Sequence, residues 1–419
     1  MSYLIIAVFL TAAAASIPIA HAILVAALAA AATSDRVPLD ILVQTMVQQV
    51  QSFPLIAIPF FMLTGSLMMG GKLGEALIGT LTALIGRFHG GPGQVGVLSS
   101  TIFGGVSGSA VADASAIGSL MIPWQKRLGY PPAFSAATLA AAATIDILIP
   151  PSIPMILFAL SSGASIAALF VAGIVPGLLM CGGFMAVCWW VGKRRNFPRE
   201  TAPFNVAAFL KHLLYASPAL LLPALIIVFL RFGVATPTEV AVLSTLYASV
   251  VSALIYKDLS LARLNKAVMD AGLSTGVVLL VIMASAAIGW LLTFDQMPNG
   301  IVNWAKENLS EPWLVILLMN LLMLVCGMFI DLPAAVLLLT PVFVPLAKSI
   351  GMDLTQLGIM MTVNLAIGLY TPPVGTTLFI TSSLAKVKVG ETVRELGPFY
   401  LVAFSVLLLV SYVPASILK

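Results

Sequence analysis

The sequence predicts an all-α integral membrane protein built from two similar halves, and three observations lead to this prediction. Hydrophobic residues make up 60% of the 419 residues and charged residues only 9%, whereas about a quarter of the residues in a soluble globular protein are charged. Landmark residues recur at a spacing of 222 positions. Each half also carries one Pro-Pro doublet inside an apolar stretch, at Pro150-Pro151 and at Pro372-Pro373.

The apolar stretches set the expected number of membrane-spanning helices. A helix needs about 20 apolar residues to cross a bilayer, so the chain has room for about ten or eleven spans, some of them broken. The first stretch, 3–32, lacks the charged start and the small-residue cleavage site of a signal peptide, and we expect a retained span. The positive-inside rule places two loops in the cytoplasm, because each gathers basic residues: Lys193, Arg194, Arg195 and Arg199 in one, and Lys257, Arg263 and Lys266 in the other.

Composition also excludes several classes of protein. The net charge of +4 rests on few residues and does not indicate nucleic-acid binding. The three cysteines lie in apolar stretches without Cys-x-x-Cys spacing, and the three histidines are scattered, so we expect neither a disulfide nor a transition-metal site. No polar stretch has the length of an ATPase domain.

The 222-residue spacing predicts an internal repeat. Gly105 aligns with Gly327, Pro123 aligns with Pro345, and the two Pro-Pro doublets align with each other. Proline and glycine dictate backbone shape, so these matches are more informative than a likeness between two Ala/Leu-rich stretches. Transporters are often built from two inverted repeats. We therefore expect one repeat over 1–195, a connecting loop over 196–217 and a second repeat over 218–419.

Each predicted repeat has the same order of elements. A long or broken first span is followed by an interfacial amphipathic helix and an apolar span. A Gly-interrupted hairpin, a span broken at the Pro-Pro doublet and a last span complete the repeat. The expected amphipathic helices cover 37–51 and 259–273, the apolar spans 53–69 and 276–293, the hairpins 93–123 and 313–345, and the broken spans 132–170 and 357–384.

The first hairpin contains FGGVSGSAVADASAIGS at 103–119, which is too rich in Gly and Ser for one stable helix. We predict a re-entrant hairpin whose tip lies at membrane depth, where non-helical backbone must be buried or line a cavity. Carbonyl and Ser oxygens at such a tip can bind a cation, and the amides that open the second helix can bind an anion. Small-residue helix packing is the alternative, but it does not explain Asp113, a costly charge in hydrocarbon.

The second hairpin contains CGMFIDLPAA at 326–335, with Asp331 as its single acid and Pro333 as a helix-start signal. Asp331 either ligates a cation or caps the helix that follows it. Both roles are compatible with this position.

The Pro-Pro doublets predict two spans that are interrupted inside the membrane. A proline removes its own donor and clashes with the carbonyl four residues earlier, so carbonyls near each doublet are free to bind a cation. A simple proline kink is the alternative for one doublet, but the recurrence of the doublet in both halves favours a binding site. Asn364 lies on the helix face that leads to the second doublet.

Asp146 breaks the correspondence between the halves. It lies four residues before the first doublet, where the second half has Gly368. It is either a cation or proton ligand or a residue that faces a polar cavity.

Together these motifs resemble the large membrane subunit of the tripartite ATP-independent periplasmic (TRAP) transporters. The resemblance runs in order over nearly the whole chain and rests on SFPLIAIPFFMLTG, GGVSGSAVADASAIGSLMIP, GYPP, IPPSIP, TPTE, FIDLPAA and NLAIGLYTPPVGTTLF. It implies an elevator-type carrier in the bacterial inner membrane that imports an organic acid with Na⁺. It also implies two partners, a periplasmic substrate-binding protein and a small membrane subunit of the DctQ type.

The resemblance implies a set of cation-binding residues, to which the first hairpin adds Asp113: Ser107, Gly108, Ser109, Gly327, Asp331, Thr371, Pro373, Thr376 and Thr377. We expect the substrate to lie near the two breaks, at Pro150, Pro151, Ser152, Asn364, Gly375 and Asp146. Na⁺ is the expected coupling ion, with no organic cofactor. Asp146 departs from the small residue that is more common in the family.

Other functions would account for part of these features. A proton-coupled carrier or another elevator-type anion carrier would share the hairpins and the broken helices. A channel would not need matched breaks in two half-chains. An intramembrane protease would need a Ser/His pair or two Asp residues on facing helices, whereas Asp113 and Asp331 each lie beside a Gly-rich break; we therefore do not expect an enzyme. The sequence does not distinguish a C4-dicarboxylate from a sialic or sugar acid.

Overall fold

The computed structural model describes residues 1–15, 17–33, 37–69, 72–199, 206–309 and 311–414. Within these ranges all regular structure is helical, so the prediction of an all-α chain is confirmed. The helices up to the connecting loop are α1 (Ser2–Ala14), α2 (Ile19–Ala32), α3 (Leu39–Val50), α4 (Ala57–Met69), α5 (Lys72–Ile85), α6 (Gly91–Ser107), α7 (Ala110–Arg127), α8 (Pro132–Ala142), α9 (Ile153–Ser162) and α10 (Ile166–Arg194). Those beyond it are α11 (Val206–Arg231), α12 (Pro237–Val250), α13 (Leu261–Phe294), α14 (Met297–Asn308), α15 (Pro312–Phe329), α16 (Leu332–Ser349), α17 (Leu354–Gly368), α18 (Thr376–Ala385), α19 (Val389–Glu395) and α20 (Gly397–Tyr412).

Six helices in the described ranges are long and apolar enough to cross a membrane, and the number rises to eight if each of two bent helix pairs is one span. The six are α10, α11, α12 with the π turn that extends it, α13, α15 and α16. Six further apolar helices are shorter, with 10–17 residues, and α8, α9, α17 and α18 among them flank the two Pro-Pro breaks. Helix length gives fewer spans than the apolar content of the sequence does, because the broken helices are too short to be counted by length. The number of ten or eleven spans stays a prediction.

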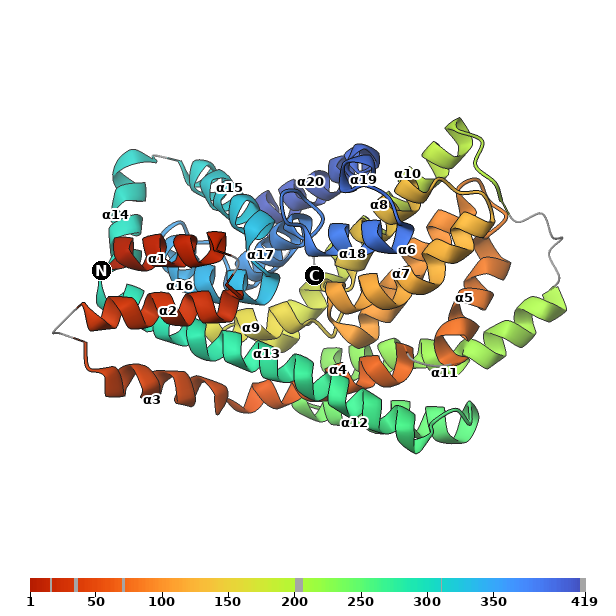
Figure 1. Cartoon of the computed structure of the whole chain (residues 1–419), viewed down its shortest axis with the longest axis horizontal. Helices are drawn as coiled ribbons and strands as arrows, with labels where there is room; N and C mark the ends of the chain where they lie inside the picture. The colour runs from red at the N-terminus through yellow and green to blue at the C-terminus, as the bar shows by residue number, and fades with distance from the viewer. Residues whose placement is uncertain (16, 34–36, 70–71, 200–205, 310, 415–419) are drawn as a thin grey trace.

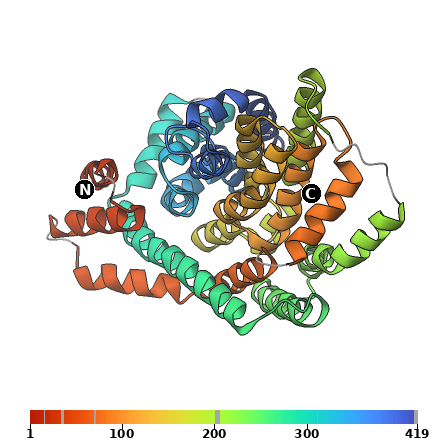
Figure 2. The ribbon, with the colours of Figure 1, turned by 45° about the vertical axis from the view of Figure 1, so that its right-hand side comes forward.

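The helices form an outer layer and an inner bundle. The outer layer consists of α2, α3, α4, α11, α12 and α13, which run along one side of the molecule (Figure 1). Its longest member, α13, packs against α2, α3 and α4, and on the inner side it contacts α16. Figure 2 shows the same layer beneath the other helices after a turn of the molecule.

The amphipathic helices of the outer layer differ between the two halves of the chain. In the first half α3 and α4 are separate and meet at an angle of 55°, since Pro54 lies in the short 3₁₀ turn Phe53–Ile56 that joins them and cannot continue the helical hydrogen bonding. In the second half α13 is one continuous helix of 34 residues. The prediction of a separate amphipathic helix over 259–273 was wrong there, because no proline interrupts this stretch.

The inner bundle consists of α6–α9 and α15–α18, and its packing crosses between the halves. Helix α7 packs against α18, and α9 packs against α16. Helices α10 and α20 contact each other and close the far side of the bundle. Three buried aromatic rings join α8, α10 and α20. The ring centroids are 5.9 Å apart for Phe134 and Phe399 and 5.4 Å apart for Phe184 and Phe399. Edge and tilted ring contacts of this kind add to the burial of the rings themselves.

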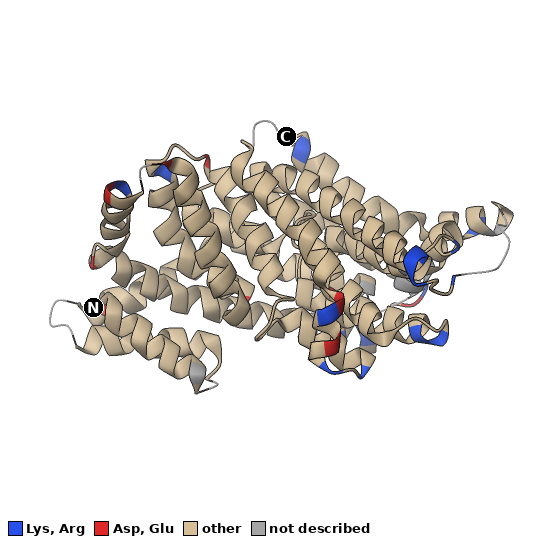
Figure 3. Cartoon of the chain, turned by 90° about the horizontal axis from the view of Figure 1, so that it is seen from above, with Lys and Arg blue, Asp and Glu red and all other residues tan. Residues whose placement is uncertain are grey.

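Charged residues lie mostly near helix ends, and the greater part of the ribbon carries none (Figure 3). Some of the basic loop residues are engaged: Arg195 forms a 2.8 Å ion pair with Glu395, and Arg263 forms an ion pair with Asp258. The connecting loop is shorter than the predicted 196–217, because α11 already begins at Val206. Residues 200–205 of that loop, and residues 35 and 36 of the loop before α3, lie outside the described ranges.

Candidate functional site

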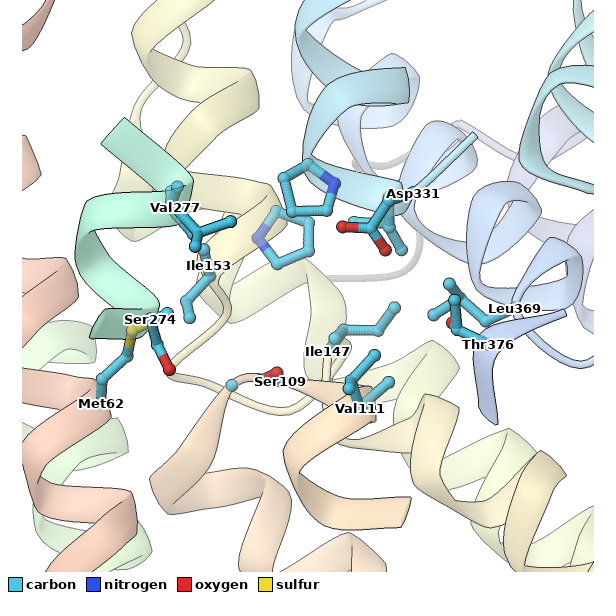
Figure 4. Close-up of a pocket in the computed structure, with 16 residues that line it drawn as sticks. Met62, Ser109, Val111, Ile147, Ile153, Ser274, Val277, Asp331, Leu369 and Thr376 are labelled. Carbon is cyan, nitrogen blue, oxygen red and sulfur yellow. The ribbon is translucent and has the colours of Figure 1, made fainter. Parts of the chain in front are cut away.

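A cavity of about 350 Å³ lies where the inner bundle meets the outer layer. Both helix breaks and the tips of both hairpins converge on it (Figure 4). We call the α6–α7 pair the first hairpin and the α15–α16 pair the second hairpin. The cavity is lined by Met62, Gly108, Ser109, Ala110, Val111, Ile147, Ile153, Pro154, Ser274, Val277, Val278, Asp331, Leu332, Pro333, Leu369 and Thr376.

The chemistry of this lining is mostly apolar, with few polar side chains. Ser109, Ser274, Asp331 and Thr376 are its polar side chains, and it contains no Lys, Arg or His. Figure 4 shows Ser109 and Ile147 along one side of the cavity and Asp331 and Thr376 on another. A solute bound here would be held by hydroxyls, backbone groups and one carboxylate, with no basic side chain from the lining to neutralise a negative charge.

The tip of the first hairpin is built from Gly108 and Ser109, between the end of α6 and the start of α7. Gly108 has φ +63°, and a Cβ at this position would lie 2.6 Å from the carbonyl oxygen of Pro151. Glycine is therefore required both for the left-handed backbone and for the close approach to the first break. Ser109 is the N-cap of α7 and accepts from the N–H of Ala112 at 3.5 Å.

Asp146 holds this tip from the side of the first break. Its carboxylate accepts three hydrogen bonds, from the N–H of Gly108 at 3.0 Å, from the N–H of Ser109 at 3.2 Å and from the hydroxyl of Ser107 at 3.1 Å. The side chain is fully buried. Gly104 on α6 makes room for it, since a Cβ there would lie 2.6 Å from the Cα of Asp146. Asp146 thus does not line the cavity but lies directly behind the tip.

Asp113, one turn into α7, is the second buried acid behind this tip. It is fully buried, and neither carboxylate oxygen has a hydrogen-bond partner among the described residues. The Ser100 hydroxyl of α6 lies beside it and is likewise without a partner. Asp113 and Asp146 are both buried behind this tip, and neither forms an ion pair within the described ranges. A buried carboxylate without partners needs a cation or a proton.

The tip of the second hairpin places Asp331 in the cavity lining at the N-cap position of α16. No side-chain capping hydrogen bond is formed at this helix start. Asp331 therefore occupies the N-cap position that the capping role requires, but its side chain does not form the capping hydrogen bond. Its carboxylate remains available to the cavity.

The second break is held by backbone contacts and threonines instead of a carboxylate. A Cβ at Gly368 would lie 2.4 Å from the carbonyl oxygen of Gly327, so the two backbones touch. The Thr377 hydroxyl donates to the carbonyl of Leu369 at 2.9 Å, and the Thr371 hydroxyl donates to that of Ile367 at 2.6 Å. These two hydroxyls serve the broken helix, whereas the Thr376 hydroxyl has no partner among the described residues and lines the cavity.

The remaining predicted site residues lie around the cavity without lining it. The Pro150-Pro151 and Pro372-Pro373 peptide bonds are both cis. Ser152 caps α9 by accepting from Met155 and donates to the carbonyl of Ile147 at 2.6 Å. Gly375, with φ +44°, is the N-cap of α18. Asn364 is buried and donates to the backbone and side-chain oxygens of Asn320 at 2.9 and 2.8 Å, which makes it a packing residue between α15 and α17.

Sequence reasoning therefore located four of the lining residues, namely Gly108, Ser109, Asp331 and Thr376. It missed Met62 of α4 and the α13 residues Ser274, Val277 and Val278, which form the outer wall. It also missed Ser100. These residues lie in continuous helices and carry no charged group or helix break that would mark a site, and only tertiary packing brings them to the site.

Known proteins resemble this chain over nearly its whole length. The family model described as tripartite ATP-independent periplasmic transporter, DctM component, matches residues 5–416. An uncharacterised protein of Sinorhizobium fredii is 54% identical, with 99% of both chains covered. The 2,3-diketo-L-gulonate TRAP transporter large permease of Escherichia coli is 36% identical, with 96% of this chain and 94% of the relative covered. The C4-dicarboxylate TRAP transporter large permease of Pseudomonas aeruginosa is also 36% identical, with 87% of this chain and 85% of the relative covered.

A solved structure supports the fold independently. The YdaH transporter of Alcanivorax borkumensis superposes with a TM-score of 0.62 at 16% sequence identity, with 89% of this chain and 88% of that chain covered. At this identity the likeness speaks for the arrangement of the helices alone.

Proposed function

Because this chain belongs to the DctM family of tripartite ATP-independent periplasmic transporters, we propose that it imports an organic acid by Na⁺ symport with an elevator mechanism. The family consists of transporter permeases, so the chain is a transport protein rather than an enzyme. The relatives are named for 2,3-diketo-L-gulonate and for C4-dicarboxylates. We propose a substrate of that general class, which includes sialic and sugar acids.

The observation that carries this proposal is the position of the cavity. It lies between two hairpin tips and two broken helices, and its outer wall comes from α4 and α13. Broken helices at membrane depth expose backbone groups that can hold ions and substrates, and transporters place their sites at such breaks. A purely structural role would not require two matched breaks that meet at one cavity.

The elevator mechanism is supported by how the walls of the cavity differ. The outer wall contributes Met62, Ser274, Val277 and Val278, which bring one hydroxyl and otherwise apolar surface. Hairpin tips and breaks in the inner bundle supply Ser109, Asp331 and Thr376. We propose that the inner bundle moves along the outer layer and carries the polar site with it. The crossed packing of α7 on α18 and of α9 on α16 supports an inverted repeat that moves as one body.

For the coupling ion we propose one Na⁺ at each hairpin tip. Na⁺ is a hard cation that prefers oxygen ligands. At the second tip the Asp331 carboxylate and the Thr376 hydroxyl meet this preference, since the one makes no capping bond and the other has no partner among the described residues. At the first tip Asp113 and the carbonyl and hydroxyl oxygens of 107–109 would serve. The other residues of the predicted cation set, Gly327, Thr371, Pro373 and Thr377, would support the second site from behind.

The partners follow from the family. We propose that the chain works in the bacterial inner membrane with a small membrane subunit and receives its solute from a periplasmic binding protein. The two relatives named as large permeases fit an assembly in which a second membrane component exists.

The test is uptake by the reconstituted transporter. We would place the chain, its small subunit and its binding protein in liposomes and measure uptake of labelled organic acids under an inward Na⁺ gradient. We expect uptake that needs both the gradient and the binding protein and that is abolished in Asp331→Ala. Asp353→Ala is the matched control, because Asp353 is exposed and far from the cavity lining.

Two other outcomes would redirect the proposal. Uptake that ignores Na⁺ but follows a pH gradient would make the chain a proton-coupled carrier. Flux that needs no gradient and no binding protein would mean a channel, and the symport proposal would be withdrawn.

A further inference from the structure

The feature that the transport cycle leaves unexplained is the buried carboxylate of Asp146. It is not part of the cavity lining, and the corresponding residue of the second half is Gly368. Its three hydrogen bonds all come from the tip of the first hairpin, two of them from backbone N–H groups. Amides that converge at a helix start form an anion site. Here that site is filled by a side chain of the same protein.

We propose that Asp146 is a built-in anion, that is, a carboxylate of the protein itself that occupies the anion site at the tip of the first hairpin. This end of the cavity therefore rejects a carboxylate of the solute. The transported acid accordingly carries one carboxylate. The inference rests on the proposed transport function and narrows its substrate class to monocarboxylates. Asp146 is a specificity-determining residue in this proposal, and it acts through the hairpin tip instead of touching the solute.

The backbone amides of Gly108 and Ser109 at the tip of the first hairpin are not free. The N–H groups of Gly108 and Ser109 both donate to Asp146, and Ser109 uses its hydroxyl to cap α7. The N–H of Ile153, at the start of α9, points to the carbonyl of Gly108 at 3.5 Å. A solute carboxylate that approached this side would find these donors already engaged.

The two hairpin tips differ in their balance of charge. Two carboxylates, Asp113 and Asp146, are buried behind the first tip, whereas Asp331 alone serves the second tip. If both carboxylates behind the first tip are ionised and each tip binds one Na⁺, the second tip becomes neutral and the first keeps one negative charge. No basic side chain of the cavity lining offsets that charge. The first end of the cavity therefore repels a second carboxylate, and neutral hydroxyl groups of the solute are accepted there.

The second half of the chain has no room for an equivalent of Asp146. Gly368 touches the backbone of Gly327, so any side chain would collide with it. In the first half Gly104 leaves the space that Asp146 fills. The difference between Asp146 in the first half and Gly368 in the second is therefore fixed by the packing around both breaks.

The first experiment tests the built-in anion without any substrate. We would purify Asp146→Ala and follow its thermal unfolding in detergent at increasing formate concentration, with chloride at equal ionic strength as the salt control. Removing the carboxylate leaves the two amides and the Ser107 hydroxyl without their acceptor, so formate should raise the unfolding temperature in a saturable manner. Wild type and Asp353→Ala should not respond.

Two results of this experiment would decide against the proposal. One is that formate stabilises Asp146→Ala no more than Asp353→Ala, and the other is that formate stabilises wild type equally. Either result means that the tip is not an anion site filled by Asp146. If Asp146→Ala does not fold, Asp146→Gly, which copies Gly368, replaces it in the same titration. Failure of every formate response in that variant overturns the proposal.

The second experiment tests the substrate class in the complete transporter. We would compare uptake of acids in matched pairs that differ by one carboxylate, gluconate with glucarate and succinamate with succinate. Wild type should prefer the monocarboxylate member of each transported pair, and Asp146→Gly should shift that preference by about tenfold toward the dicarboxylate. Equal or better uptake of the dicarboxylate by wild type overturns the inference. Absence of Na⁺-dependent uptake of every acid instead counts against the proposed function, and the formate result stands apart from it.

Discussion

The two hairpins have the same construction but are held in different ways. Each consists of two helices joined by a break of two residues, at 108–109 and at 330–331, and each tip faces the same cavity. The first tip is fixed by the carboxylate of Asp146, whereas the second break is held by the contact between Gly327 and Gly368. A similar backbone path can therefore be stabilised either by a buried charge with donors or by close packing.

The difference matters because the Asp146 carboxylate and the Gly327–Gly368 contact leave different groups free at the two tips. At the first tip the backbone donors are used and Asp113 is left without a partner. At the second tip Asp331 and the Thr376 hydroxyl are available to the cavity. Four substitutions break or sharpen this comparison, and they follow in order of the effect expected.

Placing an aspartate at position 368, which corresponds to Asp146 of the first half, should cause the largest loss of stability. In Gly368→Asp the new Cβ would lie 2.4 Å from the carbonyl of Gly327. The collision and the buried charge should lower the free energy of unfolding by about 3 kcal/mol or more. Unfolding by SDS titration measures this, with Gly272→Ala as the control because nothing lies within 4 Å of a Cβ there. A stable Gly368→Asp variant would mean that the second break adapts as the first does.

The polar pair that supports the second hairpin should give the next largest effect. Asn364→Leu removes both hydrogen bonds to Asn320 and leaves the buried side-chain oxygen of Asn320 without this donor. The free energy of unfolding should fall by about 2 kcal/mol. Because Asn364 does not line the cavity, the KM for the solute should stay unchanged. Asn303→Leu, at an exposed position, is the control. A changed KM at unchanged stability would support the substrate role predicted from sequence.

The unpartnered acid of the first hairpin should affect the ion more than the fold. Asp113→Asn removes a buried charge that has no hydrogen-bond partner among the described residues, so the unfolding temperature should not fall. The apparent affinity for Na⁺ should drop about tenfold, since a carboxylate ligand is lost at the proposed first cation site. Na⁺ titration of uptake measures this, beside Asp353→Asn. An unchanged Na⁺ dependence would confine coupling to the second hairpin.

The cap of the broken helix α9 should give the smallest effect. Ser152→Ala loses the bond to the N–H of Met155 and the bond to the carbonyl of Ile147. The expected cost is about 1 kcal/mol of unfolding free energy. Ser165→Ala, which removes the exposed cap of α10, should cost less because water replaces the lost bond. Equal costs at the two sites would indicate that water also reaches the first break.

Much of this protein followed from the sequence because the signals were local. Few charges and long apolar stretches require helices in a membrane, since the backbone must satisfy its own hydrogen bonds there. The Pro-Pro doublets and the Gly-rich segments interrupt helices wherever they occur, so the breaks near Pro150 and Pro372 and the tips at Gly108 and Asp331 could be predicted. These tips are the part of the cavity that sequence reasoning identified.

Only the tertiary structure decided which residues meet at the cavity and what each one contacts. Asn364 and Asp331 both lie near a break in the sequence, yet one binds Asn320 and the other lines the cavity. Ser274 carries no motif, and Met62 lies in the phrase SFPLIAIPFFMLTG without a chemical group that marks a site; both reach the cavity because α13 and α4 pack against the inner bundle. The role of Asp146 was open because its donors lie about 40 residues earlier in the chain. Hydrogen-bond partners at that separation depend on how helices pack, and packing is a property of the whole fold.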